Sequence, residues 1–307
     1  MIRMYISGTP SGSDTYLEEE AARSTYRLFS LHGNYLPAVL KWLDKARTYK
    51  KLPKAILLDS GAFTAWNKGH KTSVDEVIDS YSQFIEKSEG MFPEIWGINL
   101  DVIPGEAGRD PTQEEIEESV IQSDINFRIL TEKFGERILP VFHQGESMER
   151  LDVVSRQAEY ICVSPRNDLA ETHRVKWARD VHLKTGSNKT HGLATTGAQM
   201  LTVPWYSVDS ATAIHVAAYG MLIFFVDNEL RKIFVTLDDE KHKYEDKHVD
   251  TLSPYMKDKC MSLIQQDQFP LEELRTNVKS RILFNITQLT NYMESLDQFH
   301  VEQLTLF

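Results

Sequence analysis

The sequence contains little cysteine and no long apolar run. Its two cysteines, Cys162 and Cys260, are isolated in the chain, which argues against a disulfide framework and against a structural zinc site. No apolar segment reaches the ~18 residues that a membrane span requires, and the first residues lack the apolar stretch of a signal peptide. We therefore expect a cytoplasmic protein that needs no metal and does not associate with a membrane.

Basic residues are also outnumbered. The chain has 34 Lys and Arg against 45 Asp and Glu, a formal net charge of −11. Affinity for phosphates comes largely from Lys and Arg, so this balance disfavours nucleic acid as a ligand unless cations gather on one face. A Gly-x-Gly-x-x-Gly motif is missing after the first apolar segment, which disfavours a dinucleotide-binding open sheet.

Short apolar segments recur along the chain, each with a polar or glycine-bearing end. We predict strands at residues 4–7, 26–32, 55–60, 96–101, 138–144, 160–164, 190–194 and 205–209. Helical spacing lies between most of them, as at 36–48, 74–88, 113–134 and 148–157. Strands that alternate with helices pair in parallel, and eight such units predict a (β/α)8 TIM barrel over residues 1–220.

The pattern changes in residues 221–307, which we expect to form an appendage packed on the barrel. A small-residue helix at 210–219 precedes a predicted hairpin of 221–226 and 232–237, and the polar stretch 238–250 is expected to be a loop. Pro270 opens a predicted long helix with one apolar stripe, which we interpret as docked on the barrel or as a dimer interface: Leu271, Leu274, Val278, Ile282, Ile286, Leu289, Met293 and Leu296.

Reactive side chains end several of the predicted strands. Asp59, Asp101 and Asp209 end three of them, and His143 and Gln144 end a fourth. A single aspartate at such a position often caps a helix or stabilises a turn. In a parallel barrel, however, the carboxyl ends of all strands meet at the active face, so these residues predict one shared site.

Around these strand ends the sequence resembles the tRNA-guanine transglycosylases. Residues 59–63, Asp-Ser-Gly-Ala-Phe, resemble the family's Asp-Ser-Gly-Gly-aromatic segment, and Ala62 stands where the family has its second glycine. Asp101, residues 143–145 (His-Gln-Gly) and 191–193 (His-Gly-Leu) match further islands, in order. Residues 206–210, Tyr-Ser-Val-Asp-Ser, are similar to the phage branch, the DNA 7-deazaguanine transglycosylases. The zinc cysteines of the tRNA enzymes are missing, which favours DNA over tRNA.

The resemblance implies a glycosyltransferase that replaces guanine in DNA by a free 7-deazaguanine base, without a cofactor. Asp209 would attack the sugar and form a covalent aspartyl-sugar intermediate, while Asp59 would act as general acid and base. Asp101 would read the guanine edge. The remaining substrate contacts implied are Ser60, Phe63, Gln144, Gly145, Gly192 and Leu193. His143 precedes Gln144 and is expected, by alternation, to point to the other side of its strand.

Cations in the loops after strands would form the rim of this site. Lys68, Lys71, Arg109 and Arg166 are expected to hold phosphates while a base is flipped into the pocket. Other functions stay open: a tRNA-guanine transglycosylase, a barrel N-glycosidase or nucleoside hydrolase, and a non-catalytic barrel that binds nucleic acid. A homodimer or an accessory protein also stays open.

Overall fold

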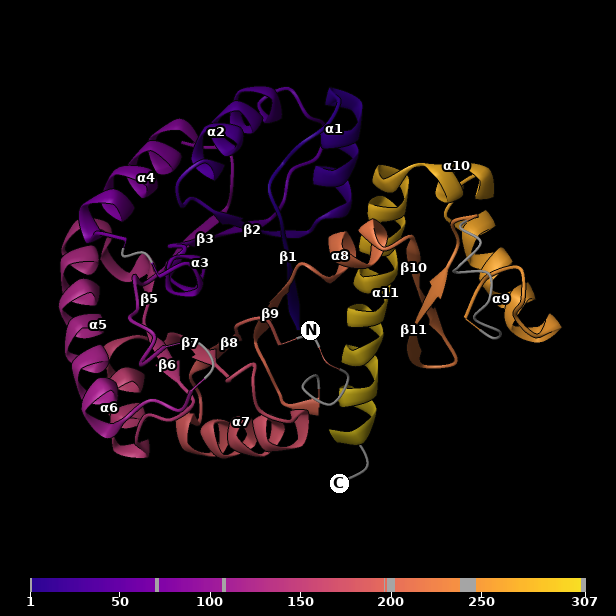
Figure 1. The fold of residues 1–307 in the computed structure, drawn as a ribbon. Helices are drawn as coiled ribbons and strands as arrows, with labels where there is room; N and C mark the ends of the chain where they lie inside the picture. The colour runs from indigo at the N-terminus through magenta and orange to yellow at the C-terminus, as the bar shows by residue number, and fades with distance from the viewer. Residues whose placement is uncertain are drawn as a thin grey trace.

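The chain folds into a parallel barrel surrounded by helices (Figure 1). A computed structural model describes residues 2–69, 72–106, 109–195, 197, 202–237 and 247–304. Nine parallel strands occur in this part of the chain, in the sheet order β5-β4-β3-β2-β1-β9-β8-β7-β6. The predicted TIM-barrel class is therefore confirmed.

The element bounds follow the predicted ones closely. The strands of the barrel are β1 (Arg3–Ser7), β2 (Tyr26–Ser30), β3 (Ala55–Asp59), β4 (Glu94–Ile98), β5 (Ile138–Leu139), β6 (Val141–His143), β7 (Tyr160–Ser164), β8 (Lys189–Gly192) and β9 (Ser207–Ser210). The helices around them are α1 (Asp14–Arg23), α2 (Tyr35–Ala46), α3 (Ala62–Asn67), α4 (Val74–Lys87), α5 (Gln113–Phe134), α6 (Met148–Gln157), α7 (Glu171–Thr185) and α8 (Thr212–Ala218), with a 3-10 turn, η1 (Gly135–Arg137). Helices α5 and α6 and strand β7 have the predicted bounds.

Pro140 divides one predicted strand into β5 and β6. Proline has no backbone N–H to donate to a ladder, so the strand pairs on a different side before and after it. Before Pro140, β5 pairs with β4; after it, β6 pairs with β7. The Pro140 carbonyl still accepts the Cys162 N–H at 2.8 Å. The divided strand thereby joins the two ends of the sheet and closes the barrel.

Alternation along each strand separates two apolar layers. Tyr5 and Leu57 belong to the cluster that fills the barrel interior, together with Val141 of β6. Their neighbours face the surrounding helices, as Ile6 and Leu58 do. Because side chains alternate with a period of two, any residue an even number of positions from an interior one also points inward.

The C-terminal residues form a hairpin and three helices. Strands β10 (Met221–Val226) and β11 (Glu229–Phe234) pair around Asp227 and Asn228, whose φ values of 53° and 65° suit a tight primed turn. Helix α9 spans Pro254–Gln266. Most of the predicted polar loop, residues 238–246, lies outside the described residues. In the described part of the chain, no helix has both the length and the apolar composition of a membrane span.

The single long helix predicted from Pro270 is wrong, because the structure has two helices there. They are α10 (Leu271–Thr276) and α11 (Val278–Leu304), separated by an extended Asn277. The buried Arg281 guanidinium donates from Nη1 to the carbonyls of Leu274 and Arg275, at the end of α10. Its Nε also donates to Ala217 O at 2.8 Å, at the end of α8. A cation at two helix C-termini compensates for the break in the helix.

Helix α11 lies between the barrel and the hairpin (Figure 1). Its Ile282 and Ile286 belong to the same apolar cluster as Ile6 of β1. On another side, the side chains of Asn285 and Gln288 accept the backbone N–H groups of Ile223 and Phe225, at 2.7 and 3.1 Å. These helix side chains thereby satisfy the edge of β10 that β11 does not pair.

We expect Asn285→Ala to lower the free energy of unfolding by about 2–4 kcal/mol, because it leaves buried backbone groups unpaired. Asn285 also donates to the Ala213 carbonyl at 3.1 Å, so both ends of its amide are used. Urea unfolding checks the value. Asn291→Ala, on the exposed side of the same helix, is the control and should change it by less than about 0.5 kcal/mol. Equal effects of the two substitutions would contradict the proposed edge contact.

Candidate active site

A cavity of about 560 Å³ opens where the strands end, and we call it the mouth cavity. Asp59, Asp101 and Asp209 all line it, as the sequence predicted they would meet. Of the other predicted site residues, Phe63, Gln144, Leu193, Arg109 and Arg166 also line it, together with His143. Three carboxylates from β3, β9 and the loop after β4 therefore share one concave site.

Asp59 points into the barrel because it stands two residues after the interior Leu57. Its Oδ1 accepts the Gly61 N–H at 3.1 Å. Gly61 has φ of +81°, and a Cβ there would lie 2.3 Å from the Cβ of His32, so only glycine permits this turn. Burial raises the pKa of Asp59 to about 6, and the negative charges of Asp209 and Asp101 contribute to this rise. The hydrogen bond from Gly61 lowers this pKa but does not outweigh burial.

Asp209 is held by several donors. Its Oδ2 accepts the Ser7 hydroxyl at 3.0 Å, and its Oδ1 accepts the Ala194 N–H at 2.8 Å. The His191 Nε2 lies 3.3 Å from the same Oδ1. Sequence reasoning did not assign Ser7 or His191 a role. The rule that polar residues at strand ends form the site would have found Ser7, which ends β1.

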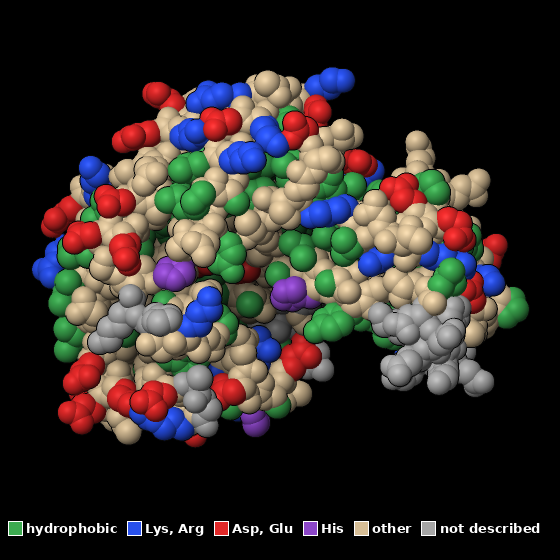
Figure 2. Space-filling view, turned by 45° about the horizontal axis from the view of Figure 1, so that its top comes forward, with side chains coloured by type: hydrophobic (Ala, Val, Ile, Leu, Met, Phe, Trp, Pro, Cys, Tyr) green, Lys and Arg blue, Asp and Glu red, His purple; other side chains and the backbone are tan. Residues whose placement is uncertain are grey.

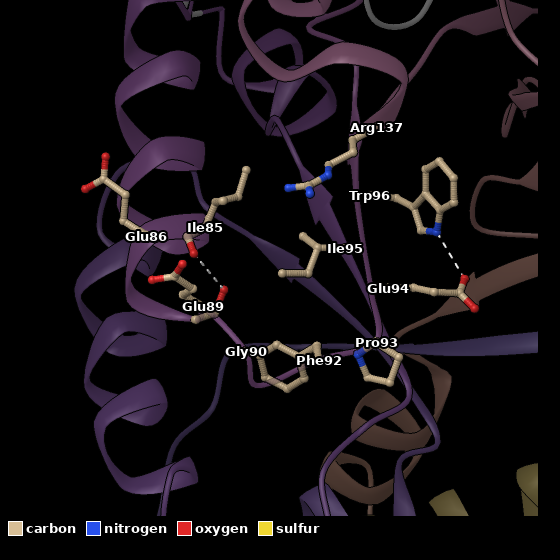
Figure 3. A pocket seen from close by; sticks show the side chains of 11 residues that line it. Ile85, Glu86, Glu89, Gly90, Phe92, Pro93, Glu94, Ile95, Trp96 and Arg137 are labelled. Carbon is tan, nitrogen blue, oxygen red and sulfur yellow. Dashed lines mark hydrogen bonds between the residues drawn. The ribbon is translucent and has the colours of Figure 1, made fainter.

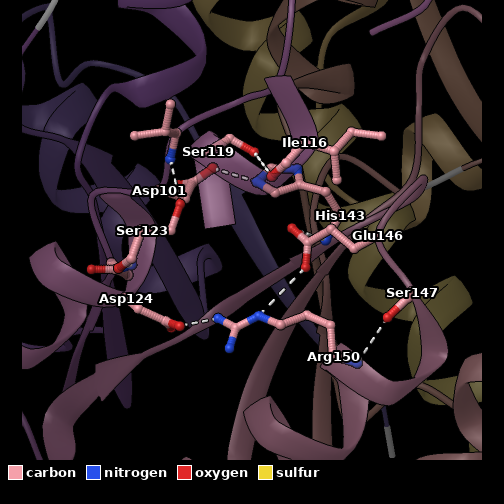
Figure 4. A network of polar contacts seen from close by, with 11 residues as sticks. Asp101, Ile116, Ser119, Ser123, Asp124, His143, Glu146, Ser147 and Arg150 are labelled. Carbon is pink, nitrogen blue, oxygen red and sulfur yellow. Dashed lines mark hydrogen bonds and ion pairs between the residues drawn. The ribbon is translucent and has the colours of Figure 1, made fainter. Parts of the chain in front are cut away.

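Asp101 forms a buried pair with His143, whose Nε2 lies 2.8 Å from Oδ2 of the carboxylate (Figure 4). Burial lowers the pKa of His143, but the hydrogen bond and the charge of Asp101 outweigh it and raise the pKa overall. Behind this pair, Glu146 accepts the His143 backbone N–H at 3.3 Å, and burial raises the pKa of Glu146. The predicted outward orientation of His143 is wrong: it stands two residues after the interior Val141 and so points inward.

Three predicted contact residues do not line the mouth cavity. Ser60 is buried, and its hydroxyl donates to the Asn99 carbonyl at 3.2 Å, which ties the end of β3 to the end of β4. Gly145 has φ of +121°, in a turn after β6. A Cβ on Gly192 would lie 2.1 Å from Thr195 Oγ1, so this glycine accommodates its own loop. These three residues therefore shape the backbone at the strand ends and in the loops that follow, and do not form the wall of the cavity.

An aromatic wall that was predicted only in part lines the same cavity. Phe63 is 52% exposed, and its ring centroid lies 6.0 Å from that of Trp66. Trp66 donates from Nε1 to the Gly105 carbonyl at 2.9 Å, which holds the indole in place. Because Trp66 follows Phe63 by three positions on α3, the two rings lie on one side of the helix.

The predicted basic rim is largely paired with carboxylates. Arg166 contacts Asp168 at 2.6 Å and Asp110 at 2.5 Å, and Arg109 contacts Glu115 at 2.8 Å. Lys68 is exposed at the end of α3, and Lys71 lies outside the described residues. On the face that Figure 2 draws, Lys and Arg side chains are interspersed with Asp and Glu. DNA, a free base and a second copy of the chain as partners stay predictions.

A second cavity, of about 590 Å³, lies at the opposite end of the barrel, where β4 begins (Figure 3). Ile95 and Trp96 line it, beside Glu94 and Arg137. Glu94 accepts hydrogen bonds from Arg3 at 2.7 Å and from the Trp96 Nε1 at 3.2 Å, so this carboxylate already has partners within the protein. Active sites of such barrels lie at the carboxyl ends of the strands, which makes the mouth cavity the candidate site.

The raised pKa of Asp59 predicts a pH-dependent cost to stability. Its folded pKa of about 6 lies above its ordinary value of 3.8, so the folded state binds the extra proton between these values. The stability of the wild type should therefore fall as the pH rises from about 4 to 6. We expect Asp59→Asn to raise the free energy of unfolding by about 1–3 kcal/mol at pH 8, and to change it little below pH 4.

Urea unfolding of both proteins at pH 4 and pH 8 measures this difference. Asp168→Asn is the matched control, because Arg166 lowers the pKa of that exposed carboxyl instead of raising it. The control should not gain stability at pH 8. A wild type and an Asp59→Asn variant of equal stability at pH 8 would show that the Asp59 carboxyl is not destabilised by burial.

Comparison with known proteins gives no family for this chain: no protein-family model matches it, and no curated protein does. Among solved structures, FabK from Thermotoga maritima is 11% identical, with a TM-score of 0.42, over 99% of this chain and 96% of that one. A mutant of the same FabK is 10% identical, with a TM-score of 0.39, over 97% and 96% of the two chains.

The prediction of a transglycosylase that exchanges guanine in DNA is corrected here, because no family model or curated protein supports it and the two similar structures named above are both FabK. The site offers a physical reason for the correction as well. The rim arginines that were to hold phosphates are already paired, and one oxygen of Asp101, the predicted base reader, accepts from His143. At such low TM-scores and identities, no property of FabK is carried over to this chain.

Proposed function

We propose that the protein is an enzyme that catalyses proton transfer on a small molecule bound in the mouth cavity, with Asp59 and Asp209 as the acid–base pair. The observation that carries this proposal is that two carboxylates line one cavity in opposite surroundings. Asp59 is desolvated and its pKa is raised to about 6, whereas Asp209 accepts hydrogen bonds from Ser7 and Ala194. Pairs of carboxyls in such different environments take different catalytic roles.

Each role follows from the surroundings of the carboxyl. Asp59, with a pKa near neutrality, can hold a proton when substrate binds and donate it in the transition state. The donors around Asp209 suit an anion, which can accept a proton or stabilise positive charge that develops in the substrate. Asp101, paired with His143, supplies a third polar group at the wall of the cavity.

The cavity also restricts the class of substrate. Its volume of about 560 Å³ suits a single small molecule. Phe63 and Trp66 offer flat aromatic surface, while three aspartates give the polar part an acidic character. A flat molecule with N–H donors or a positive charge therefore fits better than an anion.

The experiment that tests this function is depletion of small molecules from a cell extract, followed by mass spectrometry. We expect the wild type to consume or produce at least one compound, and Asp59→Asn and Asp209→Asn to slow that change by about 10²–10⁴-fold. The control is Asp110→Asn, which removes a carboxylate that pairs with Arg166 at the rim, and it should retain activity. Conversion at the wild-type rate by both site variants would refute the proposal.

The pH dependence of that conversion provides a separate check. If Asp59 is the general acid, the active form carries its proton, and this form declines above its pKa of about 6. We expect kcat/KM to fall about tenfold for each pH unit above about 6. A kcat/KM that rises between pH 6 and 8 would assign Asp59 the role of base instead.

A further inference from the structure

A chain of buried polar side chains extends from Asp209 into the barrel. His191 Nε2 lies 3.3 Å from Asp209 Oδ1, and His191 Nδ1 lies 2.6 Å from the Ser207 hydroxyl. The Ser207 hydroxyl lies 2.6 Å from the hydroxyl of Tyr160. His191 and Ser207 are fully buried, and Tyr160 is 4% exposed. The mouth cavity is therefore connected to the interior through three adjacent strands.

The register of these strands explains why the groups meet. His191 of β8 stands opposite Ser207 of β9, and both side chains point into the barrel. Asp209 follows Ser207 by two residues and so projects on the same side, one step closer to the mouth. The ring of Tyr5 packs edge-on against the His191 ring at 5.7 Å, which restricts the imidazole further.

Counting donors and acceptors gives this chain one direction. An ionised Asp209 can only accept, so the His191 Nε2 facing it must bear the hydrogen. A neutral His191 then has an acceptor at Nδ1, to which Ser207 donates its single hydrogen. The Ser207 oxygen in turn accepts from Tyr160, which stays a donor because burial raises the pKa of its hydroxyl well above its usual range.

We propose that His191 is a positioning residue, held by Ser207 and Tyr160 as the Nε2–H tautomer, which orients Asp209 for the reaction. This proposal rests on the proposed function, since it assigns Asp209 an ionised state. Oδ1 accepts the Ala194 N–H and lies within ion-pair distance, 3.3 Å, of the His191 Nε2, which has no hydrogen-bond partner of its own among the described residues, whereas Oδ2 accepts the Ser7 hydroxyl. A hydrogen-bond donor behind a catalytic side chain commonly sets the orientation of that side chain in this way.

The test is the tautomer of His191, measured by long-range ¹H–¹⁵N correlation on protein labelled at histidine. The His191 signal is assigned as the one that His191→Gln removes. We expect the wild type at pH 7.5 to show a neutral ring with its hydrogen on Nε2 alone. A ring with its hydrogen on Nδ1, or with both nitrogens protonated, would overturn the proposal.

Two serine variants of strand β9 test what selects the tautomer. Ser207→Ala removes the donor to Nδ1, and we expect the single-tautomer signal to be replaced by a mixture of both tautomers. Ser210→Ala is the matched control, because the Ser210 hydroxyl contacts Thr212 and not the histidine. An unchanged Nε2–H signal in folded Ser207→Ala would overturn the role assigned to Ser207. Should that variant fail to fold, the tautomer of His191 in the wild type still decides whether the proposal holds.

Activity separates this inference from the proposed function. With the compound found by extract depletion, Ser207→Ala should lower kcat about tenfold or more and leave KM within about twofold, because it disturbs the orientation of Asp209 and not binding. Failure to find any converted compound would count against the proposed function and leave the tautomer result standing. A wild-type kcat in a Ser207→Ala protein with mixed tautomers would overturn the positioning role.

Discussion

The alternation of side chains in a closed parallel barrel is the constraint on which the rest of this structure depends. Interior positions such as Leu57 and Val141 are filled by apolar residues that exclude water. At the carboxyl end of the strands the same interior positions are polar, and the side chains there cannot turn toward solvent without breaking the register. Asp59, His143 and Asp209 are directed into one cavity for this reason.

Directing carboxylates into a closed space costs free energy, and the structure offsets the cost unequally. Asp101 has His143 as a partner, and Asp209 has Ser7, the Ala194 N–H and the His191 ring. Asp59 has the Gly61 N–H, and burial together with the two neighbouring charges raises its pKa to about 6. The carboxyl whose burial outweighs its hydrogen bonds is thus the one suited to carry a proton, a common arrangement in active sites.

Part of this site could be read from the sequence by position alone. The segments before Asp59 and Asp209 are short and apolar, and a parallel arrangement brings their ends together whatever the details of packing. The hydrogen-bond partners of these carboxylates could not be predicted, because Ser7 and Asp209 are 202 positions apart in the sequence and meet only when β1 pairs with β9. The orientation of His143 was missed because alternation was counted from Gln144, which follows the end of β6, and not from the interior residues Leu139 and Val141.

The sequence by itself determined the barrel class, most helix and strand bounds and the three aspartates at the mouth, since these follow from local periodicity. Only the tertiary structure decided the break between α10 and α11, where Arg281 joins the ends of two helices. It also decided the pairing of the rim arginines with Asp110, Asp168 and Glu115. Such contacts depend on the distances between segments far apart in the chain, which a pattern along the sequence does not contain.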